Sequence, residues 1–386
     1  MTTDLPTTAP TTTRAPAADT APAEPAGPAG PAGPHPARGG RRRWCLGTRL
    51  LVAATAAWVV FLGLHVLLAG RWWPWLVVEA MPTLTVVVVP ALLLLVVPLA
   101  RPVRRWLSVV LVALLLAGVR LAGFGTGSPG AEATGPPGTE VSVFTWSADY
   151  WEMTDDPDAF YAFLREQDAD VYLLQEYLHW EGDGPIRIDR TDRLRAEFPG
   201  YQVIVDGELL TLSRLPVVSA HHRPVPTTGT DWYWNGPKSQ RTDLLVGGRT
   251  VSFYNVHLPV PFRIGDHPLS GRFYRFLEGQ GTWRLRELRA LRADLAGNPN
   301  PAVVAGDFNS PWMELTSLGA GAEAHNPTDG VLPARSWPVS DYPFPRLWRL
   351  DWLFTTGGLA VPGYRFGGGE SFSDHFAQHI RVVVPE

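Results

Sequence analysis

Three strongly apolar runs lie between residues 46 and 124, and they constrain the fold of this chain more than any other feature. The runs are Leu46–Gly70, Trp75–Ala100 and Trp106–Phe124. Each is close to the ~20 residues that a helix needs to cross the hydrocarbon core of a bilayer. Prolines at Pro82, Pro90 and Pro98 are expected to kink the second run. The sequence therefore predicts three transmembrane helices within residues 44–123.

The arginines that flank these runs predict their orientation, because Lys and Arg in short loops stay on the cytoplasmic side. The basic residues on the expected cytoplasmic side are Arg38, Arg41, Arg42, Arg43, Arg101, Arg104 and Arg105. Only Arg71 lies between the first two runs, in a turn whose tryptophans are candidate anchors at the outer interface. An odd number of spans then puts everything after Phe124 outside the cytoplasm. The Arg, Ala, Pro and Gly bias is typical of a GC-rich bacterial genome, so a bacterial plasma membrane is expected.

Low-complexity segments flank the apolar region on both sides. Residues 1–43 are rich in Thr, Ala, Pro and Gly without apolar periodicity, which predicts a disordered cytoplasmic tail. Residues 124–139 form a Gly/Pro linker. Fully extended, about 15 residues reach only ~50 Å. The remaining domain, residues 140–386, is therefore expected to stay close to the membrane surface.

The charge of this last domain bears on its partners. It carries 22 Lys and Arg against 32 Asp and Glu, a formal balance of −10. An acidic domain gains little from nonspecific attraction to nucleic-acid phosphates, so a nucleic-acid partner is disfavoured without being excluded. Cys45 is the sole cysteine, so no disulfide can form within the chain.

Short apolar strands alternate with helical stretches from Glu140 onward. The strands expected from β-branched and aromatic content are VSVFTW, DVYLLQ, QVIV, LLTLS, VSFYNVHL, AVVAGDF, RLDWLF and HIRVVV. The expected helices are DAFYAFLREQ and TWRLRELRALRADLAG, the second with leucines at three- and four-residue steps. The pattern predicts an α/β (α+β) fold, a four-layer αββα sandwich of two mixed sheets covered by helices.

Several of the expected strands end on polar side chains that can bind a metal or a phosphate. These side chains are Glu176, His257, Asp307, Asn309, Asp351, Asp374 and His375. Taken singly, a carboxylate after a strand is most often a turn or cap residue. Seven such groups at five strand ends are improbable as turn chemistry alone, so the sequence indicates one polar site at the sheet edges.

The order of these motifs resembles that of the endonuclease/exonuclease/phosphatase superfamily, over Glu140 to Glu386. LLQEY resembles its metal-binding QE motif, LSRLPV its SRxP segment, and YNVHL its strand that bears a His or Tyr. GDFNSP, RLDWLF and SDHF resemble its GDFN, R-[IL]-D-[YW] and SDH motifs, and this succession is the most specific part of the resemblance. The resemblance implies a hydrolase of phosphoester bonds that depends on Mg²⁺, with Mn²⁺ as the alternative.

The resemblance also implies a metal site. Glu176 is expected to hold the ion through oxygen, the ligand type that Mg²⁺ prefers, and Asp374 to add carboxylate charge beside it. The chain departs from the family in its first strand motif, where Ser147 stands in place of the usual Asn. A hydroxyl is a weaker ligand than an amide oxygen, and Asp149 is expected to compensate.

The same resemblance implies roles in catalysis. Asp307 would orient or deprotonate the attacking water, and Asn309 would donate to a phosphate oxygen. His375, aligned by Asp351, would hydrogen-bond a nonbridging oxygen or protonate the leaving group. His257 would contact the phosphate from the opposite side.

Two further expectations concern the histidines. His375 is expected on a solvent-reachable loop, so that its replacement should change stability little. The acidic partner of His257 is not evident from the motifs, and Asp243, which comes before the strand that carries His257, is the candidate.

Two aromatic loops bear on the substrate. Pro261–Phe276 contains arginines and aromatic residues, as expected of either a nucleic-acid groove or a solvated surface loop. Asp231–Lys238 contains Trp232, Tyr233 and Trp234, which could touch lipid or simply pack on the sheets. The short tether favours a lipid-borne phosphate.

Three spans followed by such a domain resemble actinobacterial membrane proteins of the glycopeptide (teicoplanin) resistance type. This resemblance implies a polyprenyl phosphate or another cell-wall lipid intermediate as substrate. Two alternatives stay open: a membrane-tethered extracellular nuclease, and a catalytically inactive domain that binds an envelope partner.

Overall fold

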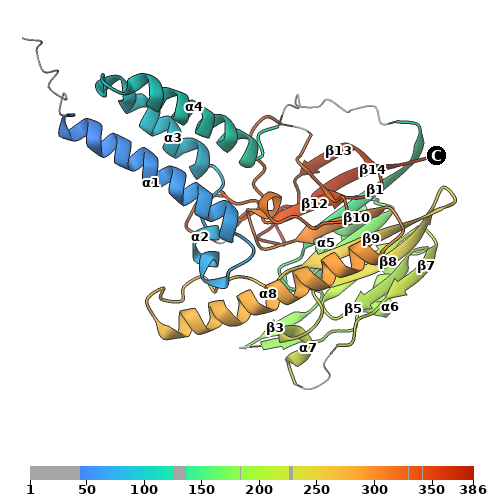
Figure 1. Ribbon diagram of the computed structural model, residues 1–386. Helices are drawn as coiled ribbons and strands as arrows, with labels where there is room; N and C mark the ends of the chain where they lie inside the picture. Colours follow the sequence, from blue (N-terminus) through green and yellow to red (C-terminus); the bar gives the residue numbers. More distant parts are fainter. Residues whose placement is uncertain (1–43, 126–135, 183, 226–228, 329, 341) are drawn as a thin grey trace, which may run out of the picture. The chain divides into compact units, whose positions relative to one another are not determined.

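The structure is a computed structural model that describes residues 44–125, 136–182, 184–225, 229–328, 330–340 and 342–386 (Figure 1). Residues Trp44–Glu386 form one compact unit. The expected disordered tail and most of the expected linker lie outside the described residues.

Helices dominate the N-terminal part of this unit. They are α1 (Leu46–Leu68), η1 (Trp73–Trp75), α2 (Leu76–Glu79), α3 (Thr85–Val96), η2 (Val97–Leu99) and α4 (Arg104–Leu121). Within the described ranges, α1 alone is long and apolar enough to cross a membrane, where the sequence predicts three such helices. Its apolar side chains are largely exposed, Leu50 and Leu67 among them, unlike those of a core helix.

The second expected span is divided, and the third is charged. Pro82 stands in the break between α2 and α3, since a proline disfavours helix in the residue before it. The apolar helix that follows, Thr85–Leu99, is shorter than a span. The helix α4 contains Arg104, Arg105 and Arg120, which reduce its apolar length.

Two mixed sheets form the rest of the unit, each six-stranded in the described part of the chain. The first has the order β13 (Ala360–Phe366), β14 (Gln378–Pro385), β1 (Gly138–Ser147), β2 (Val171–Gln175), β6 (Leu209–Ser213) and β5 (Gln202–Asp206). The second has the order β11 (Glu323–His325), β12 (Asp351–Thr355), β10 (Ala302–Asp307), β9 (Arg249–His257), β8 (Ser239–Val246) and β7 (Val217–His221). Smaller elements are the hairpin β3 (His179–Glu181) and β4 (Gly184–Ile186) and the turn η3 (Met313–Leu315).

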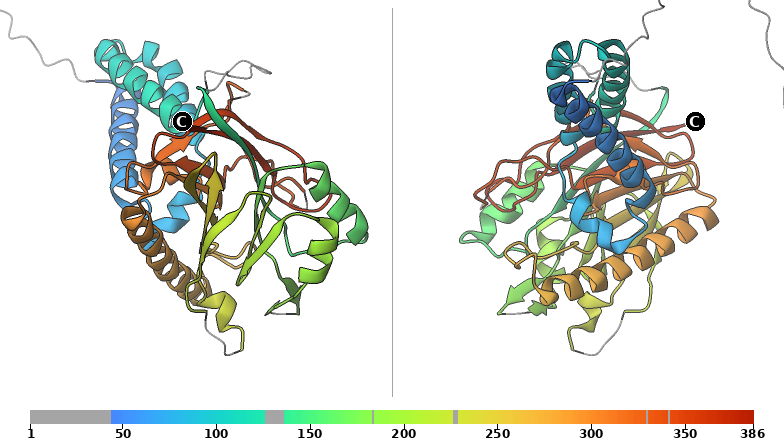
Figure 2. Two further views of the ribbon diagram at one scale, coloured as in Figure 1. Left: turned by 90° about the vertical axis from the view of Figure 1, so that its right-hand side faces the viewer. Right: turned by 60° about the vertical axis from the view of Figure 1, so that its left-hand side comes forward.

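The sheets pack face to face through alternating apolar side chains, with Val143 and Leu173 of the first against Phe253, Val303 and Leu353 of the second. The helices α5 (Pro157–Glu166) and α6 (Thr191–Glu197) cover the outer face of the first sheet. The helix α8 (Gly271–Gly297) covers the outer face of the second, as Figures 1 and 2 show. These layers give the αββα sandwich that the sequence predicts.

Some elements differ from the expectation. The helix α8 begins at Gly271, eleven residues before the expected helical stretch at Thr282, because Ser270 caps it by accepting a hydrogen bond from the Phe273 amide. The strands β7, β8 and β13 and the helices α6 and α7 (Asp231–Trp234) were not expected. In β8 the buried side chains Gln240 and Thr242 interrupt the apolar pattern.

Candidate active site

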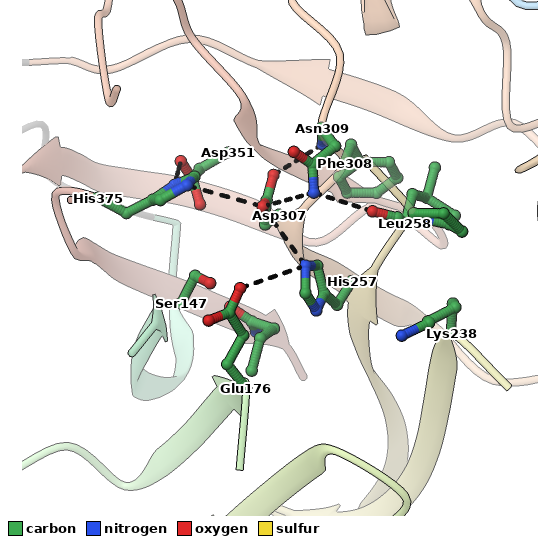
Figure 3. Close-up of polar contacts among 12 residues, drawn as sticks. Ser147, Glu176, Lys238, His257, Leu258, Asp307, Phe308, Asn309, Asp351 and His375 are labelled. Atoms are coloured by element: carbon green, nitrogen blue, oxygen red, sulfur yellow. Dashed lines mark hydrogen bonds and ion pairs between the residues drawn. The ribbon is translucent and has the colours of Figure 1, made fainter. Parts of the chain in front are cut away.

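The register of three strands brings three polar residues to one sheet edge. Asp307 ends β10, and it is aligned with His257 at the end of the parallel strand β9. On its other side Asp307 is paired with Asp351, the first residue of β12. Neighbouring positions in a sheet lie about 5 Å apart, so the pairing alone sets these side chains next to one another (Figure 3).

The first sheet contributes the facing side of the site. Ser147 at the end of β1 is aligned with Gln175 at the end of β2, and Glu176 follows directly. Glu176 has a left-handed backbone (φ 63°), and its carboxylate accepts a hydrogen bond of 3.0 Å from the Tyr150 amide. The buried amides of Gln175 and Asn255 join the two sheets through a 2.6 Å hydrogen bond directly beneath this edge.

Asn309 holds the carboxylate of Asp307. The Asn309 backbone amide donates to Oδ1 of Asp307 at 2.7 Å, and its side-chain Nδ2 donates to Oδ2 at 2.9 Å. The same Nδ2 donates to the carbonyl of Leu258 at 2.9 Å. A contact between Asn309 and a phosphate oxygen would therefore displace one of these hydrogen bonds.

His375 is oriented by Asp351. The Nδ1 atom of His375 lies 2.8 Å from Oδ2 of Asp351, while Nε2 lies 3.8 Å from Oδ2 of Asp307. Burial alone would lower the pKa of His375, but the carboxylates of Asp351 and Asp307 raise it well above its usual value. At 6% exposure His375 is buried, so the expectation of a solvent-reachable loop is wrong. The hydroxyl of Ser373 holds the loop inward by accepting from the His375 amide at 3.0 Å and donating to the Ser147 carbonyl at 2.7 Å.

Glu208 is the acidic partner of His257, which the sequence pattern did not identify. Its Oε2 lies 3.2 Å from Nδ1 of His257, and its Oε1 forms a buried ion pair with Lys238. Burial alone would raise the pKa of Glu208, but Lys238 and His257 hold it at about 2. Glu208 stands one residue before β6, outside every motif, and its only sequence signal is an acid at the start of an otherwise apolar strand.

The other candidate partner, Asp243, lies elsewhere, so that expectation is wrong. Its carboxylate accepts hydrogen bonds from Arg241 and from Ser252, the latter at 2.6 Å. Oδ2 of Asp243 also contacts His221 at 2.9 Å. These contacts stabilise the β7–β8–β9 edge of the second sheet.

The negative charges of three other carboxylates act on Glu176. Partial burial and the negative charges of Asp149, Glu208 and Asp374 raise the pKa of Glu176 to about 7, although His257 opposes the rise. Such mutual repulsion is what a bound cation would relieve, and oxygen ligands suit Mg²⁺ or Mn²⁺.

Three groups deeper in the site, Asp307, Asp351 and His375, also have potential ligand atoms within 4.8 Å of one another. Burial and the charge of Asp351 raise the pKa of Asp307 to about 6, although His375 and His257 oppose the rise. Nδ1 of His375 is already in contact with Asp351, which leaves its Nε2 atom facing Asp307.

Aromatic side chains lie on two sides of the site. Tyr150 packs on Trp180 at 5.5 Å between ring centroids, and Trp180 packs on Tyr233 at 5.9 Å. On the other side Trp337 packs on Trp348 and donates a 2.7 Å hydrogen bond from its indole to Asp374.

The segment after α1 contacts the loops that carry the site. The indole of Trp312, three residues after Asn309, donates to the carbonyl of Met81 at 3.1 Å. The indole of Trp348, three residues before Asp351, donates to the carbonyl of Ala80 at 2.7 Å. The site loops thus rest on residues between α2 and α3.

Arg284 of α8 contacts both the loop that follows His257 and the loop that follows Asp307. Its buried guanidinium donates to the carbonyl of Pro259, after His257, and to that of Phe308, after Asp307, the latter at 3.0 Å. The buried carboxylate of Glu79 at the end of α2 supplies a countercharge.

Comparison with known proteins gives one family. The model of the "Endonuclease/Exonuclease/phosphatase family" matches residues 140–375. Among solved structures, an endonuclease/exonuclease/phosphatase from Beutenbergia cavernae DSM 12333 is 19% identical, with a TM-score of 0.45 over 64% of this chain and 72% of that one. Truncated Caenorhabditis elegans TDP2 is 18% identical, with a TM-score of 0.44 over 64% and 98%. No curated protein matches the chain.

Proposed function

The chain belongs to the endonuclease/exonuclease/phosphatase family, and we propose that it hydrolyses a phosphodiester or pyrophosphate of a lipid-borne phosphate at the outer surface of a bacterial membrane. Members of this family are usually hydrolases of phosphoester bonds. One observation carries the proposal: His257, His375 and Asp307 lie close together at the end of the sandwich where Glu176 also lies. The loops that follow Asp307 and precede Asp351 contact the segment after α1.

The metal would be held by Glu176 with Asp149 and Asp374, and Ser147 would add a hydroxyl at most. A divalent ion there would neutralise charge on the phosphate. Mg²⁺ is the proposed ion, with Mn²⁺ as the alternative.

The protein residues would divide the proton transfers among them. Asp307 would take a proton from the attacking water as its oxygen bonds to phosphorus. His375, kept protonated by Asp351, would give its Nε2 proton to the leaving oxygen as the phosphorus–oxygen bond breaks. His257, charged beside Glu208, would stabilise the negative oxygens of the phosphate.

The helix α1 supports the membrane location. Arg41, Arg42 and Arg43 precede it and favour a cytoplasmic N-terminal side. The orientation is the same for one span and for three, because any odd number of spans puts the catalytic domain on the side of the membrane opposite to the N-terminus. The helices α3 and α4 pack on α1 through apolar side chains such as Leu93 and Leu111, which is consistent with a small multi-pass bundle.

A lipid substrate is favoured over nucleic acid by the rim of the site. Nonspecific binding of DNA depends on basic side chains, whereas the rim described above is aromatic and the domain has a balance of −10. Together with the membrane segment, these features support the glycopeptide-resistance type of membrane protein and a polyprenyl phosphate or related lipid as substrate.

A side-by-side assay tests the proposal. The full chain in lipid nanodiscs with Mg²⁺ would be offered a polyprenyl pyrophosphate, a sphingomyelin-like phosphodiester and plasmid DNA, with Asp307→Asn as the inactive control. Release of phosphate or headgroup from a lipid, lost in the control, is expected. Nicking of plasmid without lipid hydrolysis would support the nuclease alternative. If no substrate were hydrolysed, the remaining alternative would be an inactive domain that binds an envelope partner.

A further inference from the structure

The loop between β9 and α8, residues 258–270, follows His257 directly and packs through Phe262 against Trp73 and Leu76, after α1. We propose that this loop, together with the first turn of α8, inserts into the outer leaflet of the bilayer as a second membrane contact beside α1. The inference rests on the proposed membrane location, and it adds a lipid-binding surface to the catalytic domain itself.

Exposed apolar side chains make this loop unlike an ordinary solvated one. Leu269 is 84% exposed and Ile264 is 52% exposed, and Val260 and Tyr274 are exposed as well. Single exposed apolar residues are common, but four within 15 residues form a surface that water solvates poorly. Such a group at the end of a domain is typical of an interfacial segment.

The base of the loop fixes its position relative to α1. Phe262, Phe273 and Leu277 pack against Trp73 and Leu76, which follow α1 directly. The approach is close at Gly281, where a Cβ atom would lie 2.5 Å from the Cβ of Trp73, so a glycine is needed there. Figures 1 and 2 show the N-terminal half of α8 lying against α2. If α1 crosses the bilayer, the loop stands at the level of its outer end.

The charges of the loop select an anionic lipid surface as its partner. Arg263, Arg272 and Arg275 are exposed there, whereas the segment 258–275 holds one acid, Asp266. This local positive charge contrasts with the acidic balance of the domain. Arginines beside apolar side chains keep their guanidinium groups among lipid phosphates while the apolar groups enter the acyl boundary.

The loop also continues toward the site. The guanidinium of Arg263 lies 4.6 Å from the ring centroid of Phe276 and 5.8 Å from that of Trp234. Trp234 packs on Tyr233 and Trp180 at the rim of the site. Aromatic contacts therefore connect the proposed lipid contact with the site.

Site-specific fluorescent labels test the inference on the full chain. In a Cys45→Ser background, Leu269→Cys would be labelled with an environment-sensitive dye in nanodiscs of phosphatidylcholine and phosphatidylglycerol, some carrying doxyl quenchers. A label at Leu64→Cys on α1 is the reference for a position inside the bilayer. A label at Val218→Cys on β7, which is also exposed, is the reference for a position in water. The label at 269 is expected to be blue-shifted and quenched at least half as strongly as the label at 64, and to lose quenching when phosphatidylglycerol is omitted.

The outcomes separate this inference from the proposed function. A label at 269 that behaves like the one at 218, while the label at 64 is quenched, overturns the lipid contact and leaves the membrane location intact. Absence of quenching at 64 overturns the membrane location and the lipid contact together. Equal quenching at 269 with and without phosphatidylglycerol refutes the preference for anionic lipid.

Discussion

Oε2 of Glu208 lies 3.2 Å from Nδ1 of His257, and Oε1 of the same carboxylate pairs with Lys238. A single buried acid thus sets the charge of a site histidine and neutralises the only lysine of the chain. The arrangement makes Glu208 a positioning residue, since it acts on the site through His257.

Glu208→Gln is expected to lower turnover by roughly 10²-fold, because His257 loses the charge that keeps it protonated. Asp243→Asn is the matched control, since that carboxylate lies on a neighbouring strand without contact to His257. Steady-state rates across pH would show the loss to be smallest at low pH, where His257 is protonated without help. A pH-independent loss would contradict the assigned role.

Loss of folding is separated from loss of function by a double variant. Glu208→Gln leaves Lys238 as an unpaired buried charge, which is destabilising by about 3–5 kcal/mol. Adding Lys238→Met removes that charge and should recover thermal stability without recovering turnover. Recovery of both would mean that Glu208 serves stability alone.

His375→Ala is expected to lower turnover by about 10²-fold or more, since it removes a positioned proton donor. Because His375 is buried against Asp351, its removal should also lower the free energy of unfolding by about 1–3 kcal/mol. Rates must therefore be measured well below the unfolding temperature of the variant. No increase in Mg²⁺ should restore the rate.

Glu176→Gln should behave differently, because it removes a negative charge from the proposed metal site. Part of the lost activity should return as Mg²⁺ is raised, with a higher half-saturating concentration and a similar maximal rate. Metal titration of both variants makes the comparison. Rescue of the His375 variant but not of the Glu176 variant would reverse the two assigned roles.

Metal affinity should depend on pH through Glu176, whose pKa is raised to about 7. Below pH 7 the carboxylate is protonated in the metal-free protein, so a cation must displace that proton and affinity should fall about tenfold per pH unit. Above pH 8 the carboxylate is already ionised and the dependence should disappear. Calorimetry in buffers of different ionisation enthalpy should detect proton release at pH 6 and none at pH 8.5.

Arg284→Gln should lower kcat by roughly tenfold or more and leave KM nearly unchanged. The guanidinium holds the backbone after His257 and after Asp307, so its loss loosens both loops without removing a substrate contact. Arg286→Gln, on the exposed face of the same helix, is the control. A change in KM alone would indicate that Arg284 contacts substrate instead.

The strands that could be predicted from the sequence are those whose composition is typical of a buried strand and which do lie in the middle of a sheet. The strands β1, β2, β9, β10 and β14 are rich in β-branched and aromatic residues and lie in the middle of the sheets. The strand β8 was missed because its buried Gln240 is satisfied by Thr211 across the sandwich, at 2.6 Å, and no local signal reports that partner.

The site residues also divide into those that a local sequence pattern indicates and those that it does not. Polar residues at the ends of recognisable strands, such as Asp307 and Asn309, could be selected as candidates, and their expected roles came from the resemblance of the motifs to the family. Glu208, Lys238 and Arg284 could not, because each reaches the site from an element whose position depends on the whole fold. The burial of His375 likewise follows from the Ser373 contact with Ser147, which is 226 residues away in sequence.

The indoles of Trp312 and Trp348 donate to the backbone carbonyls of Met81 and Ala80, so residues that come before the Gly/Pro-rich segment in sequence belong to the packing of the domain that follows it. A recombinant fragment cut at residue 138 would leave both indoles without acceptors and uncover the apolar surface around Trp312. Such a fragment should self-associate in solution. Replacing the N-terminal helices by those of a homologue would therefore require residues 70–82 to be kept together with the domain that contains Trp312 and Trp348.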